Sequence, residues 1–526
     1  MIRMLVALPA LLLATALPAA AELPKGFEEQ VETLRQQSGA PGIALAVVEK
    51  GKVTLAKGWG MRKLGGSEKV DADTIFQTGS TGKAFTAAAL AILVDRGKIK
   101  WDDRVIDHMP WFRMYDPWVT REITIRDLLV HRSGLGLGAG DLLFVPRGSL
   151  SRKETIKRLA HIKPAYSFRS RYAYDNILYA VAGQLIEEVS GKSWEDFMAQ
   201  DVFAAGGMTS ATANYETRLA NPNRAQPHAR IAGAVRGDGP ISMLDERAAE
   251  LGRAALPAGG LALSANDLAR WLQIQLGQGA LPDGGRLFSA EQAAEMWKGV
   301  TPMPIAPMPP SLAPLTPKFS SYGLGWNVTD YRGVRVMSHG GAVFGAIAYV
   351  ILLPDQEVGI AGVVNAEETA LLRGVIQTLV DHYLDAPDQD WPTRFNTFIE
   401  QRVSGAKAAL ATKRAAPAKV GPSLALDRYA GTYRDAWYGD VVVAKGKNGL
   451  TIDFTTTPAM KGKLVHWQYD TFVTRFDDTS LEPAYVTFAL DAEGKVERVS
   501  LKPESPIADF SYDYQDLDLR PVGAAQ

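Results

Sequence analysis

The chain has 526 residues, no cysteine, and a formal net charge of −1 from 57 basic and 58 acidic residues. The balanced charge disfavours nucleic acids and anionic membranes as partners, and the lack of cysteine excludes thiol catalysis and disulfides. This length exceeds that of one ordinary domain, and 46% apolar residues suffice for two cores.

The N-terminus has the pattern of a secretory signal. Arg3 precedes an apolar stretch at 4–17, and three alanines follow at 19–21. We expect a signal peptide at 1–21 and a periplasmic or secreted protein. The alternative, an uncleaved anchor, is disfavoured by two prolines and by the small-residue end of the stretch.

The next segments predict regular elements around a buried helix. Helical spacing of apolar residues favours a helix at 27–37, and strands are expected at 42–48 and 53–59 as a hairpin. Residues 84–94 are strong helix formers and nearly all apolar, which predicts a buried central helix.

Ser80-Thr81-Gly82-Lys83 stands at the start of that helix. A serine hydroxyl needs a base to become a nucleophile, and residues three apart lie on one helix face. To serve as this base near pH 7, Lys83 must lose about three pKa units from ~10.4, at a cost of about 4 kcal/mol. An N-cap role is the alternative for Ser80. A second Ser-x-x-Lys, at 404–407, has no apolar helix behind it and is interpreted as chance.

Helices are predicted at 124–130, 174–189, 193–203, 264–276 and 367–383, and strands at 333–339, 345–353 and 358–364. The glycine-rich stretch at 134–140 fails the dinucleotide-binding spacing and is interpreted as a flexible loop. The proline-rich stretch at 302–317 is expected to be an extended loop that could wall a cleft.

Two further motifs occur once each: Tyr174-Asp175-Asn176 and His339-Gly340-Gly341. The order Ser-x-x-Lys, Tyr-x-Asn, His-x-Gly resembles the serine β-lactamase and penicillin-binding-protein superfamily. The tyrosine in the second motif resembles its class C branch, which includes D-aminopeptidases, D-Ala-D-Ala carboxypeptidases and esterases. Motif-like segments at 128–135, 257–261 and 322–326 extend the resemblance, which covers roughly 27–384.

The resemblance implies that Ser80 becomes acylated and that Lys83 and Tyr174 share the general-base work. A cation beside Tyr174 favours its phenolate, and Lys83 could supply that charge. Asn176 would bind Lys83 and the substrate amide. For Tyr174 the alternative is a core tyrosine with its hydroxyl satisfied.

The resemblance also implies substrate-binding residues on the strand of the third motif. The backbone N–H groups of Ser80 and Ala342 would bind the oxyanion. Gly340 and Gly341 would let a substrate backbone lie close to the strand. His339 is a departure, because class C β-lactamases have lysine there. A histidine is shorter and half neutral near pH 6.5, which disfavours binding of a β-lactam carboxylate. Histidine at this position resembles the peptidases of the family more than the lactamases, and some esterases also depart here. His131 is interpreted as a structural loop histidine.

We therefore expect an exported serine hydrolase, first of all a peptidase on short peptides that can contain D-residues or derive from cell wall or linearised cyclic peptides. A carboxylesterase on small acyl esters is the second reading, followed by a β-lactamase and a slow-turnover penicillin-binding protein. Neither Gly-x-Ser-x-Gly nor His-Glu-x-x-His occurs, and seven scattered histidines form no ligand cluster. We expect no metal and no cofactor, and the oligomeric state stays open.

The expected fold class is α/β. A two-part β-lactamase-like domain, an antiparallel sheet flanked by helices plus a helical region, should span 22–400. A linker rich in Ala, Lys and Ser is predicted at 401–423, followed by a small antiparallel barrel at 424–526. Residues 426–433 resemble the opening of lipocalin-like domains. The barrel either caps the cleft or is a packing module; its strands are expected at 441–444, 450–454, 471–476, 484–490 and 496–502.

Overall fold

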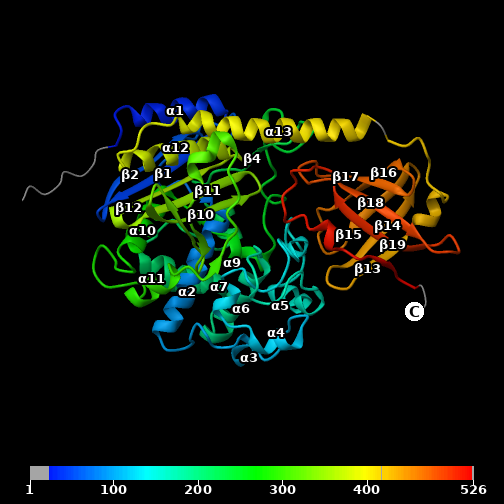
Figure 1. Ribbon diagram of the computed structural model, residues 1–526, viewed down its shortest axis with the longest axis horizontal. Helices are drawn as coiled ribbons and strands as arrows, with labels where there is room; N and C mark the ends of the chain where they lie inside the picture. The colour runs from blue at the N-terminus through cyan, green and yellow to red at the C-terminus, as the bar shows by residue number, and fades with distance from the viewer. Residues whose placement is uncertain (1–22, 416, 524–526) are drawn as a thin grey trace, which may run out of the picture.

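A computed structural model describes residues 23–415 and 417–523, so the predicted signal peptide at 1–21 lies outside the described residues. Two bodies lie side by side, a large α/β domain and a smaller barrel, and the long helix α13 (Trp391–Ala415) runs along both (Figure 1). Among the described residues, no helix combines the length and apolar character that crossing a bilayer requires.

The large domain is built on one antiparallel sheet with helices on both faces. Within residues 23–415, eight strands form one antiparallel sheet in the order β2-β1-β12-β11-β10-β9-β8-β7. Its central strands are buried throughout and rich in Val, Ile and Ala, as expected for strands covered on both faces. The strands are β1 (Gly42–Glu49), β2 (Lys52–Gly60), β7 (Thr301–Pro302), β8 (Ser320–Tyr322), β9 (Asn327–Tyr331), β10 (Val334–Val343), β11 (Ala346–Leu353) and β12 (Val358–Val364).

Helices cover both faces of this sheet. On one face lie α1 (Phe27–Ser38), α12 (Thr369–Tyr383) and the first part of α13. On the other lie α10 (Ala265–Leu276) and α2 (Lys83–Asp95), which is buried from Lys83 to Leu93. Phe85 of α2 stacks on Trp271 of α10 with ring centroids 3.8 Å apart. The predicted central helix is confirmed, and its burial is what removes Lys83 from water.

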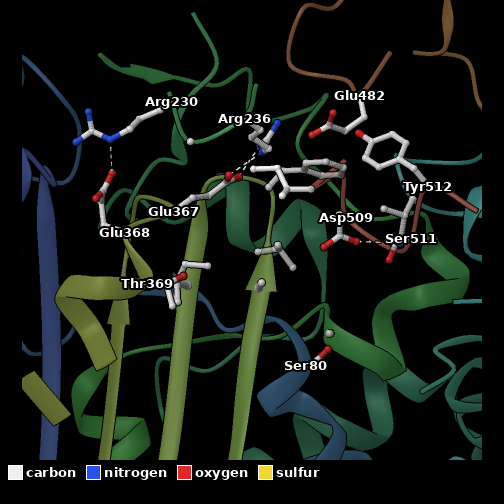
Figure 2. A pocket seen from close by; sticks show the side chains of 18 of the residues that line it. Ser80, Arg230, Arg236, Glu367, Glu368, Thr369, Glu482, Asp509, Ser511 and Tyr512 are labelled. Atoms are coloured by element: carbon white, nitrogen blue, oxygen red, sulfur yellow. Dashed lines mark hydrogen bonds and ion pairs between the residues drawn. The ribbon is translucent and has the colours of Figure 1, made fainter. Parts of the chain in front are cut away.

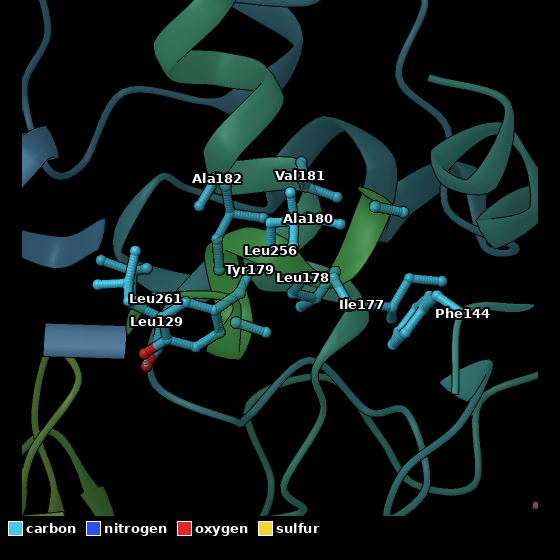
Figure 3. Close-up of a cluster of buried hydrophobic side chains, with 14 of the residues drawn as sticks. Leu129, Phe144, Ile177, Leu178, Tyr179, Ala180, Val181, Ala182, Leu256 and Leu261 are labelled. Atoms are coloured by element: carbon cyan, nitrogen blue, oxygen red, sulfur yellow. Dashed lines mark hydrogen bonds between the residues drawn. The ribbon is translucent and has the colours of Figure 1, made fainter. Parts of the chain in front are cut away.

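The helical region follows α2 in the chain. Figure 3 shows the first turns of α6 (Ile177–Ser190) packed on residues around Leu256 and Leu261, with Phe144 at one side. Two short antiparallel pairs lie apart from the large sheet, β3 (Phe76–Gln77) with β6 (Ala262–Leu263) and β4 (His228–Arg230) with β5 (Ile241–Met243). The His228 N–H of β4 donates to the Gly345 carbonyl, between β10 and β11, at 3.0 Å. Its helices are α3 (Val105–His108), α4 (Pro117–Glu122), α5 (Arg152–Lys157), α6 (Ile177–Ser190), α7 (Trp194–Phe197), α8 (Tyr215–Ala220), α9 (Leu256–Gly259) and α11 (Ala290–Met296).

The predicted helix at 124–130 is wrong, because only a 3₁₀ turn at Arg126–Leu128 forms there. The buried Asp127 side chain accepts from the Thr124 N–H at 3.0 Å and pairs with Arg132 at 2.8 Å. His131 then adopts a positive φ of 54°. These local bonds turn the chain where a helix would have continued.

The second body is the expected barrel. Over residues 417–523, eight strands follow the order β19-β18-β17-β16-β15-β14-β13-β20, and Val499 bridges to Leu519, which nearly closes the sheet. Burial alternates along its strands, as in β15, so one face fills the interior. The strands are β13 (Gly431–Asp435), β14 (Gly439–Gly446), β15 (Gly449–Phe454), β16 (Lys461–Gln468), β17 (Thr471–Phe476), β18 (Ala484–Leu490), β19 (Val496–Pro503) and β20 (Arg520–Pro521).

Helix α13 connects the bodies, so the segment predicted as a linker at 401–423 is helical as far as Ala415. Its start is held by Trp391, whose Nε1 donates to the buried Asp381 at 2.6 Å. Further along, Leu410 packs in a small cluster with Val235 of the large domain and Ile507 of the barrel. The helix therefore positions the barrel against the large domain.

Candidate active site

The turn that carries Ser80 is pressed against strand β10. Gly79–Gly82 form a 3₁₀ turn that leads into α2, and Gly79 has a φ of +53°. A Cβ on Gly79 would lie 2.7 Å from the Ala342 nitrogen. The absence of a side chain at Gly79 therefore allows the serine turn and the third-motif strand to touch.

Lys83 binds Ser80 directly. Its Nζ donates to Ser80 Oγ at 2.9 Å, to Asn176 Oδ1 at 2.7 Å and to the Ala258 carbonyl at 2.9 Å. Burial lowers the pKa of Lys83 to about 7, although the charges of Asp141 and Asp175 oppose the shift. The neutral amine is therefore well populated near pH 7. A neutral amine can keep its bonds to Asn176 and Ala258 and turn its lone pair toward the Ser80 hydroxyl.

Tyr174 also reaches Ser80. The Ser80 side chain lies near enough to the Tyr174 hydroxyl to influence its pKa, and Lys83 Nζ lies 4.7 Å from the centre of the Tyr174 ring. Burial raises the pKa of Tyr174 well above 10, against the lowering effect of Ser80. The phenolate that we expected Lys83 to favour is therefore disfavoured, and the lowered pKa of Lys83 leaves the amine as the base of the pair.

The third-motif strand offers an open edge beside Ser80. In the described structure β9 pairs with β10 over Val334–Ser338 and ends there, whereas β11 pairs with it as far as Val343. A Cβ on Gly341 would lie 2.0 Å from the Thr78 carbonyl oxygen. The protein's own backbone thus requires this glycine. Gly340 has more room, because the nearest atom to a Cβ there is in the Tyr349 ring at 3.6 Å.

His339 lies beneath this edge with protein partners at both nitrogens. Nδ1 is 2.6 Å from the Gly340 carbonyl, which can only accept, so Nδ1 carries the proton and Nε2 accepts from the Tyr322 hydroxyl at 2.8 Å. Burial, with the charge of Lys83, lowers the pKa of His339 to about 3. The ring is neutral at physiological pH and links β10 to Tyr322 of β8. Its predicted contact with substrate stays a prediction.

Ser80, Asn176 and Ala342 line one end of a cavity of about 330 Å³ whose walls come from both bodies. Arg230 pairs with Glu368 and Arg236 with Glu367, each with Nε 2.7 Å from a carboxylate oxygen, on the side of the cavity away from Ser80 (Figure 2). The barrel adds Glu482, Asp509, Ser511 and Tyr512, so it walls the cleft. The described lining residues include none from the loop at 302–317, which instead packs Leu312 against the helices of the outer face.

Several residues of the site were not identified from the sequence. Asp141 Oδ2 accepts from Asn176 Nδ2 at 2.8 Å and from Ser511 Oγ at 2.8 Å. The Ala258 carbonyl lies within the segment 257–261, which was noted as a motif without a role. The only sequence feature that could have pointed to Asp141 is the glycine-rich stretch before it. The polar stretch around Ser511 contains no motif that points to a functional role.

A serine and a buried lysine one turn apart at the start of a central helix, beside the open part of strand β10 in the antiparallel sheet, define an acyl-transfer type of serine hydrolase site. A comparison with protein families matches the Beta-lactamase family over residues 27–383. The chain therefore belongs to the β-lactamase family of serine hydrolases. Residues 415–521 match a domain of unknown function, DUF3471.

Known relatives agree with this family. An unguisins hydrolase, ungD, of Aspergillus violaceofuscus is 29% identical over 451 residues, which cover 78% of this chain and 75% of that protein. Penicillin-binding protein 4 of Amycolatopsis lactamdurans is 30% identical over 341 residues, covering 64% and 84%. The octameric penicillin-binding protein homologue from Pyrococcus abyssi superposes with a TM-score of 0.57 at 19% identity, covering 91% and 98%. At this identity the last likeness shows the fold alone.

Proposed function

We propose that this serine hydrolase is a peptidase that cleaves short peptides through an acyl-enzyme on Ser80. The observation that carries the proposal is the contact of Lys83 Nζ with Ser80 Oγ at 2.9 Å, next to a strand edge left open over residues 339–343. An extended peptide can add to such an edge through its backbone. The substrates can contain D-residues or derive from cell wall or linearised cyclic peptides.

In the proposed acylation step, neutral Lys83 takes the Ser80 proton as Oγ bonds to the substrate carbonyl carbon. The backbone N–H groups of Ser80 and Ala342 receive the oxyanion. The C–N bond then breaks, and the leaving amine takes a proton from the Tyr174 hydroxyl, which Lys83 reprotonates. Neutral Lys83 then takes a proton from water as the water oxygen bonds to the acyl carbon. The bond from that carbon to Ser80 Oγ breaks, the acid is released, and Oγ takes the proton back from Lys83.

The state of His339 bears on the choice among relatives. Its ring is neutral at physiological pH, because burial holds its pKa near 3, and both nitrogens already have partners. This position therefore supplies no cation for a substrate carboxylate beside the scissile bond. That argues against a β-lactamase or a carboxypeptidase and in favour of a substrate whose chain continues past the cleaved bond. One relative, 29% identical, bears the name unguisins hydrolase, which supports hydrolytic activity for this chain.

A carboxylesterase is the second candidate. Phe144, Val145, Leu251 and Ile347 give the cavity an apolar part that suits an acyl chain. The alcohol of an ester is also a better leaving group than the amine of a peptide, so it depends less on a proton donor. The motifs at Ser80 serve both reactions equally.

A panel of L- and D-aminoacyl p-nitroanilides, short peptides, nitrophenyl esters and nitrocefin tests the choice. We expect turnover of peptides or anilides that is lost in Ser80→Ala. Turnover of esters alone would refute the peptidase proposal and favour the carboxylesterase. Peptide hydrolysis that persists in Ser80→Ala would refute the proposed nucleophile.

A further inference from the structure

The barrel reaches the catalytic side chains through a short segment, residues 509–513. The Phe510 ring meets the Tyr174 ring edge-on, with centroids 5.8 Å apart. Gly138 makes room for it, because a Cβ there would lie 2.7 Å from the Phe510 ring. The Gly138 N–H in turn donates to the Tyr174 carbonyl at 2.9 Å. The glycine-rich loop, expected to be flexible, is thus held between Tyr174 and the barrel.

The same segment binds the turn that carries Asp141. Asp513 accepts from the N–H groups of Gly140 at 2.7 Å and Leu142 at 3.0 Å. Ser511 Oγ donates to Asp141 Oδ2 at 2.8 Å. Asp141 is fully buried, and these bonds come from residues about 370 positions away in the chain. Removing a hydrogen-bond partner from such a buried carboxyl carries a large free-energy cost.

Asp141 determines which way the Asn176 amide points. Because a carboxyl oxygen accepts, the bond of 2.8 Å from Asn176 Nδ2 fixes the NH₂ group toward Asp141. The amide oxygen therefore faces Lys83, whose Nζ it accepts at 2.7 Å. A reversed amide would present donors to the donors of Lys83. The order Ser511, Asp141, Asn176, Lys83, Ser80 is thus a continuous set of side-chain hydrogen bonds.

We propose that Ser511 is a positioning residue of the active site: through Asp141 it fixes the Asn176 amide that holds Lys83 beside Ser80. The barrel then completes the catalytic centre as well as walling the cleft. This inference rests on the proposed acylation of Ser80, whatever the substrate.

The charges around this network give a readout that a merely structural contact would not change. Burial raises the pKa of Asp141 to about 8, and the bonds from Asn176 and Ser511 oppose that rise. Without the Ser511 hydroxyl the pKa of Asp141 rises further, so the carboxyl is neutral over more of the range around pH 7. Its negative charge supports protonation of Lys83, so its loss lowers the pKa of Lys83. The other charged groups that act on Lys83 or Asp141 are Asp175, Asp509 and Asp513.

The experiment measures the second-order rate of Ser80 labelling by a fluorophosphonate against pH, in the full chain, with melting temperature by circular dichroism. Ser511→Ala should lower the plateau rate about tenfold, the worth of one buried hydrogen bond, and move the midpoint to lower pH. Ser511→Thr, which keeps the hydroxyl, should recover most of the rate. Ser505→Ala is the control, because that hydroxyl accepts from the Ile507 N–H within the barrel segment.

Wild-type rate and midpoint in Ser511→Ala would overturn the inference. If Ser511→Ala lowers the melting temperature, Asp141→Asn probes the other end of the same bond from the large domain, and wild-type labelling there would also overturn it. Ser80→Ala separates the two proposals. Labelling retained in Ser80→Ala refutes the proposed nucleophile and the inference together, whereas its loss, beside wild-type labelling of Ser511→Ala, refutes the inference alone.

Discussion

Lys83 Nζ lies 2.9 Å from Ser80 Oγ on a side chain with 0% exposed surface. The burial follows from the apolar sequence of α2, which the sheet and the helical region cover on all sides. That burial lowers the pKa of Lys83 to about 7. The helix therefore both positions Lys83 beside Ser80 and lowers the pKa of its amine.

Replacing Lys83 by arginine should slow acylation strongly while keeping a cationic side chain at this position. A guanidinium keeps its proton at every physiological pH, so it cannot take the Ser80 proton. We expect kcat/KM for a nitrophenyl ester to fall about 10²- to 10⁴-fold. Lys407→Arg is the matched control, because Lys407 belongs to the second Ser-x-x-Lys and pairs with Asp238 on the exposed side of α13. More than a tenth of wild-type activity in Lys83→Arg would contradict the role of the amine.

The pH dependence of Ser80 labelling should follow the deprotonation of the Lys83 amine. Only neutral Lys83 acts as a base, so the rate should rise with pH through about 7 and level off above it. Asp175 raises the pKa of Lys83 by its charge. Asp175→Asn should therefore move the midpoint to lower pH, measured as labelling rate against pH from 5 to 10. A midpoint that moves upward would show that another group titrates.

Tyr174→Phe separates the hydroxyl from the ring. The ring packs on His131 with centroids 4.2 Å apart, so phenylalanine should keep the melting temperature close to wild type. Loss of the hydroxyl beside Ser80 removes the proposed proton donor, and kcat/KM for a p-nitroanilide should fall about 10²-fold. Tyr172→Phe, in the same aromatic group, is the control. Equal effects of the two changes would place Tyr174 among the core tyrosines.

The sequence predicts those parts of the site that depend on spacing. Ser80 and Lys83 are one turn apart, and Tyr174 and Asn176 stand just before α6, which begins at Ile177 rather than at 174. Strands β1, β2, β10, β11 and β12 of the large sheet were expected from their apolar and β-branched runs, and 358–364 matches β12, whereas the shorter β7, β8 and β9 were not predicted. The family and the two-body α/β fold with a barrel were predicted correctly for these reasons.

What could not be predicted depends on contacts between distant segments. Ser511 meets Asp141 because the barrel docks beside the helical region, and no local pattern encodes that docking. The Ala258 carbonyl is a backbone atom, which leaves no residue type to recognise. The helix expected at 124–130 failed because buried Asp127 binds Arg132 and the Thr124 N–H, a tertiary arrangement that overrides propensity.

The two glycines of the third motif should respond differently to alanine. A Cβ on Gly341 would lie 2.0 Å from the Thr78 carbonyl, so Gly341→Ala must push β10 away from the serine turn. Moving the Ala342 N–H off the oxyanion position should cost about 10²- to 10³-fold in kcat/KM for every substrate, small esters included.

At Gly340 a Cβ meets nothing closer than the Tyr349 ring at 3.6 Å, so Gly340→Ala should keep the wild-type melting temperature. If a peptide backbone lies along this edge, that methyl group obstructs it. We expect KM for peptides to rise while kcat/KM for nitrophenyl acetate, which does not extend along β10, stays close to wild type. Steady-state kinetics on both substrates measures the split. An unchanged KM for peptides in Gly340→Ala would place the substrate elsewhere in the cavity, away from β10.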